Sequence, residues 1–115
     1  MKKLEFIIRP DKLDKLKQVL TECRAGGVTL SSAMGCGNQK GRTDSSSYKG
    51  IELADMNLIP KLKAEVVVDD DQVEPMLALI HEHLSTGNVG DGKVFVLPVE
   101  EAMRIRTGQR GRKAI

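Results

Sequence analysis

Apolar and β-branched residues gather in four short stretches of the chain, and each stretch predicts a β-strand. Residues 3–10, KLEFIIRP, form the first run, which Pro10 ends. Residues 28–35 form a weaker run with several small side chains. Residues 61–68 form the third run, in which the charged residues Lys61, Lys63 and Glu65 alternate with the apolar residues Leu62, Ala64 and Val66, as expected of a strand with one buried face. Residues 93–99 form the fourth run.

Two segments between these strands have the spacing of amphipathic helices. The first has apolar residues at three- and four-residue steps, namely Leu13, Leu16, Leu20 and Cys23. We expect Asp11 to cap this helix and the pair Gly26 and Gly27 to end it. The second helix follows the acids of residues 69–71, tolerates Pro75 in its first turn and ends by Gly87. Its apolar face comprises Val73, Leu77, Ile80 and Leu84.

The order strand, helix, strand, loop, strand, helix, strand predicts an α+β protein of the ferredoxin-like β-α-β-β-α-β plan. We expect one domain over residues 1–115, with a short extra strand in the tail. Periodicity is absent from residue 35 to about residue 57, between the second and third strands. Because loops of this length are usually functional or disordered, this loop indicates a binding role.

Charge and composition exclude several classes of protein. The 18 basic and 16 acidic residues nearly cancel to a net charge of +2, so no global field attracts nucleic acid or anionic lipid. Neither a membrane span nor a secretory signal is evident, and we expect a cytoplasmic protein. The two cysteines, Cys23 and Cys36, form no metal or redox motif and are interpreted as idle or buried thiols.

The segment GNVGDGKVFV carries the clearest chemistry in the sequence. Gly90 and Gly92 allow positive φ and expose backbone N–H groups to an anion, and Lys93 adds positive charge. Arg104 and Arg106, two residues apart, would point the same way on an extended segment, and two forked donors suit a phosphate chain. The Walker and Rossmann patterns are absent, so an ordinary turn and a solvated arginine edge remain the alternatives.

Other chemistries find less support. His81 and His83 lie two apart on the second helix and point to nearly opposite faces, so they cannot share one zinc ion. No nucleophile motif is present, and an acid or base role for Glu65 or Asp91 stays open. The aromatic residues are too few to stack RNA bases on the sheet, and we expect no direct nucleic-acid binding.

Several segments together resemble the PII signal-transduction family over almost the whole chain. They are KKLEFIIRPDKLDKLKQVL, GCGNQKG, IPKLKAEVVVDDDQVE and TGNVGDGKVFVLPVEEAMRIRTGQRG. The resemblance implies a homotrimer, not an enzyme, that binds ATP or ADP between subunits and often 2-oxoglutarate beside Mg-ATP. It also implies a long T-loop, here about residues 37–57, that controls an ammonium transporter, an enzyme or a transcription regulator of nitrogen metabolism. Such a transporter would recruit the protein to a membrane.

The same resemblance assigns site residues by matching positions. The nucleotide contacts fall on Gly27, Val28, Thr29, Gly35, Gly37, Asn38, Gln39, Glu65, Val67, Gly90, Asp91, Gly92, Lys93, Arg104 and Arg106. The 2-oxoglutarate contacts fall on Gln39, Lys40, Gly41, Lys61 and Gly90. Gln39 would also hold the magnesium ion that accompanies ATP. The glycine turn and the arginine pair would then form one phosphate site across a subunit interface.

The T-loop departs from the usual family pattern. Leu53 stands where many members have the tyrosine that is uridylylated, and Tyr48 and Lys49 are the expected contacts with a target protein. Asn38 stands where many members have an arginine near the outer phosphates, which puts the preference between ATP and ADP in question. One alternative is therefore an energy sensor that binds ATP or ADP without 2-oxoglutarate and regulates another transporter or nitrogenase. A small phosphatase or ATPase is the other.

Overall fold

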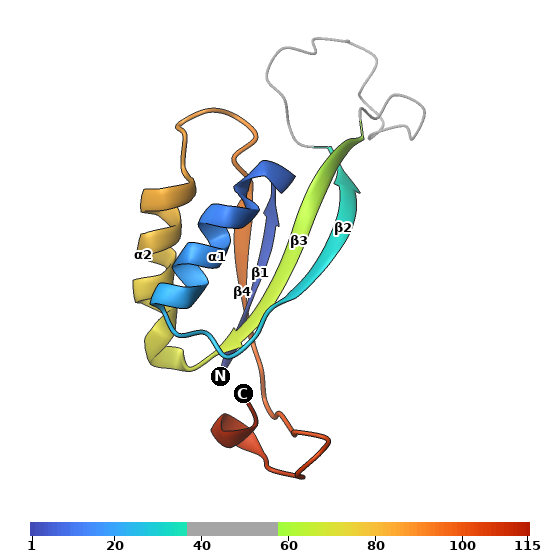
Figure 1. Ribbon diagram of the computed structural model, residues 1–115, viewed down its shortest axis with the longest axis vertical. Helices are drawn as coiled ribbons and strands as arrows, with labels where there is room; N and C mark the ends of the chain where they lie inside the picture. The colour runs from blue at the N-terminus through green and yellow to red at the C-terminus, as the bar shows by residue number, and fades with distance from the viewer. Residues whose placement is uncertain (37–57) are drawn as a thin grey trace.

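The computed structural model describes residues 1–36 and 58–115, and within them two helices cover one face of a four-stranded sheet (Figure 1). The strands are β1 (Lys2–Ile8), β2 (Thr29–Gly35), β3 (Ile59–Val68) and β4 (Lys93–Pro98). The sheet order is β2-β3-β1-β4, and every neighbouring pair is antiparallel. This arrangement confirms the predicted α+β, ferredoxin-like plan.

The core lies between the sheet and the helices. Alternate residues of the two central strands point toward the helices and are buried, namely Leu4, Phe6, Ile8, Ala64, Val66 and Val68. The helices α1 (Leu13–Glu22) and α2 (Val73–Leu84) contribute Leu16, Val19, Leu20, Val73, Met76, Ile80 and Leu84. The alternation predicted for residues 61–68 is therefore confirmed, and it leaves the charged positions of β3 on the other face of the sheet.

Helix α1 differs from the sequence prediction at both ends. A 3-10 turn, η1 (Pro10–Lys12), precedes it, and the cap position of that turn is occupied by Arg9, so the assignment of Asp11 as the cap was wrong. The helix ends at Glu22, before the glycine pair. Arg24 adopts a positive φ of 53°, and its N–H donates to the carbonyl oxygen of Thr21 at 3.0 Å. The N–H of Ala25 donates to the carbonyl of Leu20 at 2.9 Å, which completes a Schellman motif without glycine.

Helix α2 follows the acidic run through a second 3-10 turn, η4 (Asp70–Gln72). The backbone N–H of Asp69 donates to Oε1 of Gln72 at 2.9 Å, which satisfies a donor at the helix entrance. Pro75 lies in the first turn of α2, as expected. The helix ends at Leu84, and the glycine that was predicted to end it follows at position 87. No described helix has the length and apolar character needed to cross a membrane.

The tail after β4 is a turn and not the extra strand that we expected. Its only pairing is the isolated bridge between Met103 and Arg110, and a last 3-10 turn, η5 (Gly111–Ala114), follows. The N–H of Gly108 donates to the carbonyl of Arg104 at 2.8 Å, which closes the intervening turn. Arg112 then binds Asp69 through two contacts of 2.8 and 3.1 Å, and this pair anchors the tail at the start of α2.

Candidate functional site

The face of the sheet that no helix covers, called the open face below, carries the predicted nucleotide residues Thr29, Gly35, Glu65, Val67 and Lys93. The strand register sets three rows across it. These rows are Ser31, Lys63, Ile7 and Lys93; then Thr29, Glu65, Glu5 and Phe95; then Val67, Lys3 and Leu97. Directly paired residues share a face, so Thr29, Glu65 and Val67 lie together at one side and Lys93 at the other.

Four charged side chains form a closed cluster at the centre of this face. Lys3 lies 3.3 Å from Glu65 and 3.8 Å from Glu5, and Lys63 lies 3.5 Å from each of the same two carboxylates. The ammonium of Lys3, followed by that of Lys63, lowers the pKa of Glu65. Glu5 and then Glu65 raise the pKa of Lys63. The Glu65 carboxylate therefore accepts from two ammonium groups at the centre of the open face.

The glycine turn at the start of β4 is held by Asp91. Its carboxylate accepts hydrogen bonds from the backbone N–H of Thr86 at 2.7 Å and from the Thr86 hydroxyl at 2.5 Å. These bonds lower the pKa of Asp91, with a smaller contribution from Arg9, whose guanidinium lies 3.8 Å away. Because the carboxylate is used within the turn, Asp91 would meet a ligand through its backbone.

The two glycines of this turn differ in their surroundings. Both have positive φ, 99° at Gly90 and 104° at Gly92. A Cβ on Gly90 would meet nothing within 4 Å, whereas one on Gly92 would lie 2.1 Å from the carbonyl oxygen of Ile7. The backbone at Gly90 is thus open to a ligand, and Gly92 is required for the approach of β4 to β1.

Arg104 and Arg106 lie at the opposite end of β4 from the glycine turn (Figure 1). Lys93 is paired with Ile7 where β4 begins, and Pro98 is paired with Lys2 where it ends. Six residues of strand span about 20 Å. The two arginines lie around the turn of the tail, so the argument that an extended backbone points them the same way was wrong. One chain therefore does not bring its glycine turn and its own arginine pair together.

Lys61 and Gly35 lie side by side at the end of the sheet next to the undescribed residues. Gly35 is paired with Ile59, and a Cβ at position 35 would touch Cγ of Lys61 at 3.6 Å. No carboxylate of the described residues lies within ion-pair distance of Lys61, nor of the predicted phosphate ligands Lys93, Arg104 and Arg106. Within residues 1–36 and 58–115, these four cations therefore have no carboxylate partner.

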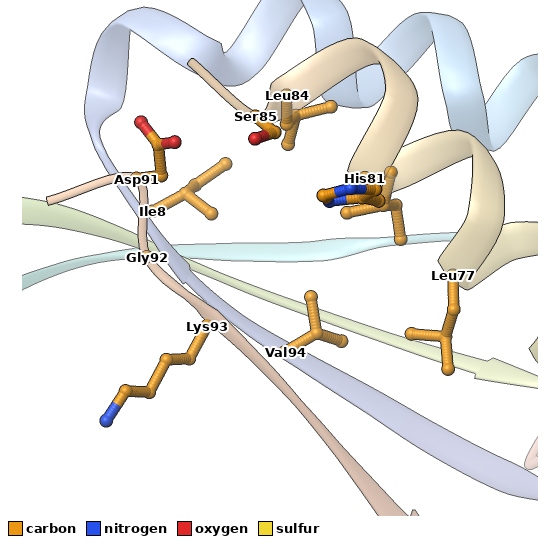
Figure 2. Close-up of a pocket in the computed structure, with 10 residues that line it drawn as sticks. Ile8, Leu77, His81, Leu84, Ser85, Asp91, Gly92, Lys93 and Val94 are labelled. Atoms are coloured by element: carbon orange, nitrogen blue, oxygen red, sulfur yellow. The ribbon is translucent and has the colours of Figure 1, made fainter. Parts of the chain in front are cut away.

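A pocket of about 330 Å³ lies on the helix side of the sheet, between α2 and the start of β4 (Figure 2). Leu77, Val94 and the imidazole of His81 line it, whereas the Lys93 side chain points away from it. The pocket is mostly apolar, and the open-face residues Glu65 and Val67 do not contribute to it. The pocket nevertheless adjoins the predicted phosphate site, because Asp91, Gly92 and Lys93 also border it.

Several predicted residues lie outside the described part of the chain. They are Gly37, Asn38, Gln39, Lys40, Gly41, Tyr48, Lys49 and Leu53. The predicted magnesium ligand and target contacts are among them. In residues 1–36 and 58–115, no group of three or more His, Cys, Asp or Glu side chains could hold a metal ion.

The structure adds residues that the sequence reasoning missed. Thr86 orders the glycine turn through Asp91, and its hydroxyl also accepts a hydrogen bond from the backbone N–H of Asn88 at 3.2 Å. A threonine before Gly-Asn is a turn signal that could have indicated this role. Lys63 holds Glu65 from within β3, whereas Lys3 holds it from β1, and that second contact depends on the β1–β3 register and has no local sequence signal.

Comparison with known proteins identifies the family. The sequence model described as nitrogen regulatory protein P-II matches residues 1–109. A nitrogen regulatory protein P-II of Azospirillum brasilense is 48% identical over 115 residues, which cover the whole of both chains. Proteins with the same description from Rhodospirillum rubrum and Bradyrhizobium diazoefficiens are 47% and 46% identical, again over the full length of both chains. The chain therefore belongs to the P-II nitrogen regulatory protein family.

Proposed function

We propose that this chain is a PII-type signalling protein that binds ATP or ADP between subunits and controls a nitrogen-metabolism target through its T-loop. One observation carries the proposal. The basic groups matched to phosphate contacts, Lys93 and the arginine pair, lie at opposite ends of β4 and have no carboxylate partners among the described residues. They can act on one phosphate chain only if two copies of the protein supply them.

The open face supports a multi-subunit assembly. Phe95 and Leu97 are 49% and 37% exposed beside the charged cluster, and Ile105 at the tail turn is 91% exposed. Both β2 and β4 are edge strands. A contact that joins the β4 side of one copy to the β2 side of the next is head-to-tail, and such contacts form a closed ring when the rotation closes. We propose the homotrimer of the family as that ring.

The predicted site residues would then have separate tasks. Gly90, Gly92 and Lys93 from one copy, with Arg104 and Arg106 from its neighbour, would bind phosphates. Glu65, with Thr29 and Val67, would lie toward the nucleoside. Lys61 would pair with a carboxylate of 2-oxoglutarate, together with Gln39, Lys40, Gly41 and Gly90. Gln39 would hold the magnesium ion, which when bound neutralises phosphate charge.

Calorimetric titration tests the ligand part of the proposal. The purified protein is titrated with Mg-ATP, with ADP, and with 2-oxoglutarate in the presence and absence of Mg-ATP. Binding of 2-oxoglutarate only with Mg-ATP is the expected result. If nucleotides bind and 2-oxoglutarate does not, the chain is instead an energy sensor that responds to ATP or ADP alone. Absence of all nucleotide binding overturns the proposal, and rapid turnover of ATP would indicate an enzyme.

Mixed assemblies test whether the phosphate site is shared. Lys93→Ala and Arg104→Ala chains are each expected to bind ATP weakly. When the two variants are unfolded, mixed and refolded together, some interfaces combine an intact Lys93 with an intact Arg104. Those interfaces should recover wild-type affinity in a fraction of the sites. If each chain carried a complete site, the mixture would bind no better than its two components.

A further inference from the structure

The four arginines of the tail fall into two classes by their partners. Arg110 lies 2.8 Å from Glu101, and Arg112 lies 2.8 Å from Asp69, so both form ion pairs within the chain. Arg104 and Arg106 have no such carboxylate among the residues that the structure describes. The tail therefore keeps the charge of one pair of arginines free while it uses the other pair for anchoring.

Arg104 is nevertheless held in place, and its side-chain partner is a neutral amide. Its Nη1 donates to Oε1 of Gln109 at 3.2 Å, and its backbone N–H donates to the Gln109 carbonyl at 2.8 Å. The hydroxyl of Thr107 lies 3.3 Å from the same Oε1, and that hydroxyl accepts a bond from the Gln109 N–H at 3.2 Å. Gln109 thus both helps to close the turn through its backbone and orients the Arg104 guanidinium through its side chain.

We propose that Gln109 is a positioning residue for nucleotide phosphate binding, which orients Arg104 without neutralising it. This inference rests on the proposed nucleotide function. A guanidinium has five N–H donors, and the contact with Gln109 uses one of them, so the remaining donors and the full charge stay available for phosphate. A glutamate at the same place would accept the same hydrogen bond but would also add an opposing charge. The identity of residue 109 therefore sets how strongly the arginine pair attracts an anion.

The primary test compares Gln109→Glu with wild type. Affinity for Mg-ATP and for inorganic triphosphate is measured by calorimetry at low salt. We expect Gln109→Glu to weaken both by about fivefold, the upper value for an exposed ion pair, and the loss to shrink as salt is raised. Gln109→Ala, which removes the orienting contact and adds no charge, should weaken binding about twofold. Gln18→Glu, an equal charge change on the exposed surface of α1, is the matched control and should leave affinity unchanged.

A double-mutant cycle separates an effect through Arg104 from a general repulsion of the ligand. Gln109→Glu is introduced into wild type and into Arg104→Ala. If residue 109 acts through Arg104, the second substitution should change affinity much less in the Arg104→Ala background. Circular dichroism and urea unfolding establish that each variant is folded. An undiminished fivefold loss in the Arg104→Ala background would show direct repulsion and overturn the positioning role.

The remaining outcomes distinguish this inference from the function on which it rests. If wild type binds ATP, Arg104→Ala binds weakly and Gln109→Glu binds like wild type, the nucleotide function stands and the role of Gln109 falls. If wild type binds neither Mg-ATP, ADP nor triphosphate, the proposed function falls and the inference falls with it. Weakening by Gln109→Glu that is larger than that by Gln109→Ala, and coupled to Arg104, supports both.

Discussion

The carbonyl oxygen of Ile7 lies where a side chain on residue 92 would begin. A Cβ built on Gly92 would be 2.1 Å from that oxygen and 3.0 Å from Cα of Ile8. Both atoms belong to the backbone of β1, which ends at Ile8, so they cannot move aside as a flexible side chain would. Residue 92 also has a φ of 104°, which side chains rarely allow. The entry of the glycine turn into β4 therefore depends on the absence of a side chain at this position.

We expect Gly92→Ala to destabilise the protein by about 3 kcal/mol or more, because backbone strain adds to a clash that only strand displacement can relieve. Urea unfolding measures the loss. Gly87→Ala is the matched control, since Gly87 also has positive φ, at 77°, but nothing lies within 4 Å of its Cβ position. It should cost about 1 kcal/mol, for the backbone conformation alone. Equal losses in both variants would contradict the clash as the main cause.

The sheet and its core could be predicted from the sequence because local alternation determines which strand residues are buried. In β3, Ala64, Val66 and Val68 are buried, and Lys63 and Glu65 lie on the open face, as the pattern of residues 61–68 predicted. Helix ends were less predictable. Gly26 and Gly27 were the obvious stop signal, but the helix ends earlier, at Glu22. Arg24 then adopts a positive φ, whose cost is outweighed by the hydrogen bonds that Arg24 and Ala25 donate to Thr21 and Leu20.

The candidate site could be predicted only in part, for a physical reason. Lys93 and the two tail arginines are close in sequence, and their placement at opposite ends of β4 emerges only when the strand is laid into the sheet. The tail turn likewise could not be predicted from the sequence. Arg104 and Arg106 follow a strand and were expected to continue it, but hydrogen bonds from Gly108 and Gln109 bend the chain instead. Such contacts depend on the closed turn and not on residue spacing.

The strained end of α1 gives a stability prediction. Arg24→Gly should stabilise the protein by about 1 kcal/mol, because glycine adopts a φ of 53° without the steric cost that other residues meet. Thermal and urea unfolding measure the change. Arg24→Ala separates loss of the charged side chain from relief of the backbone and should give no comparable gain. A gain from alanine as large as that from glycine would show that the arginine side chain, and not φ, is the source of the strain.

Lys61 and Lys93 should divide the two ligands. Lys93→Ala is expected to weaken ATP binding by about 1–3 kcal/mol, the range for a hydrogen bond to a charged group. Lys61→Ala should retain ATP binding and lose 2-oxoglutarate, because Lys61 is matched to a 2-oxoglutarate carboxylate and lies at the other end of the open face from the nucleoside residue Val67. Calorimetry with each ligand measures both effects. A parallel loss of ATP and 2-oxoglutarate in Lys61→Ala would contradict this division.

The Asp91–Thr86 contact predicts an acid-dependent loss of stability. The folded pKa of Asp91 is lowered, first by the Thr86 hydroxyl and then by the Thr86 N–H. A group with a lowered folded pKa stabilises the fold above its unfolded pKa, about 3.9 for Asp, and that contribution is lost as pH falls through the folded pKa.

Asp91→Asn isolates this contribution from those of the other carboxylates with lowered pKa, such as Glu101 and Asp69. The difference in unfolding free energy between wild type and Asp91→Asn should be constant between about pH 5 and 7 and should shrink below about pH 4. Urea unfolding at several pH values measures it. Thr86→Val removes the hydroxyl donor but keeps the backbone N–H donor. The difference in unfolding free energy between wild type and Thr86→Val should therefore also shrink below about pH 4, but it should be smaller than the difference for Asp91→Asn. A difference that stays constant down to about pH 2 would mean that the ionised Asp91 carboxylate does not hold the glycine turn.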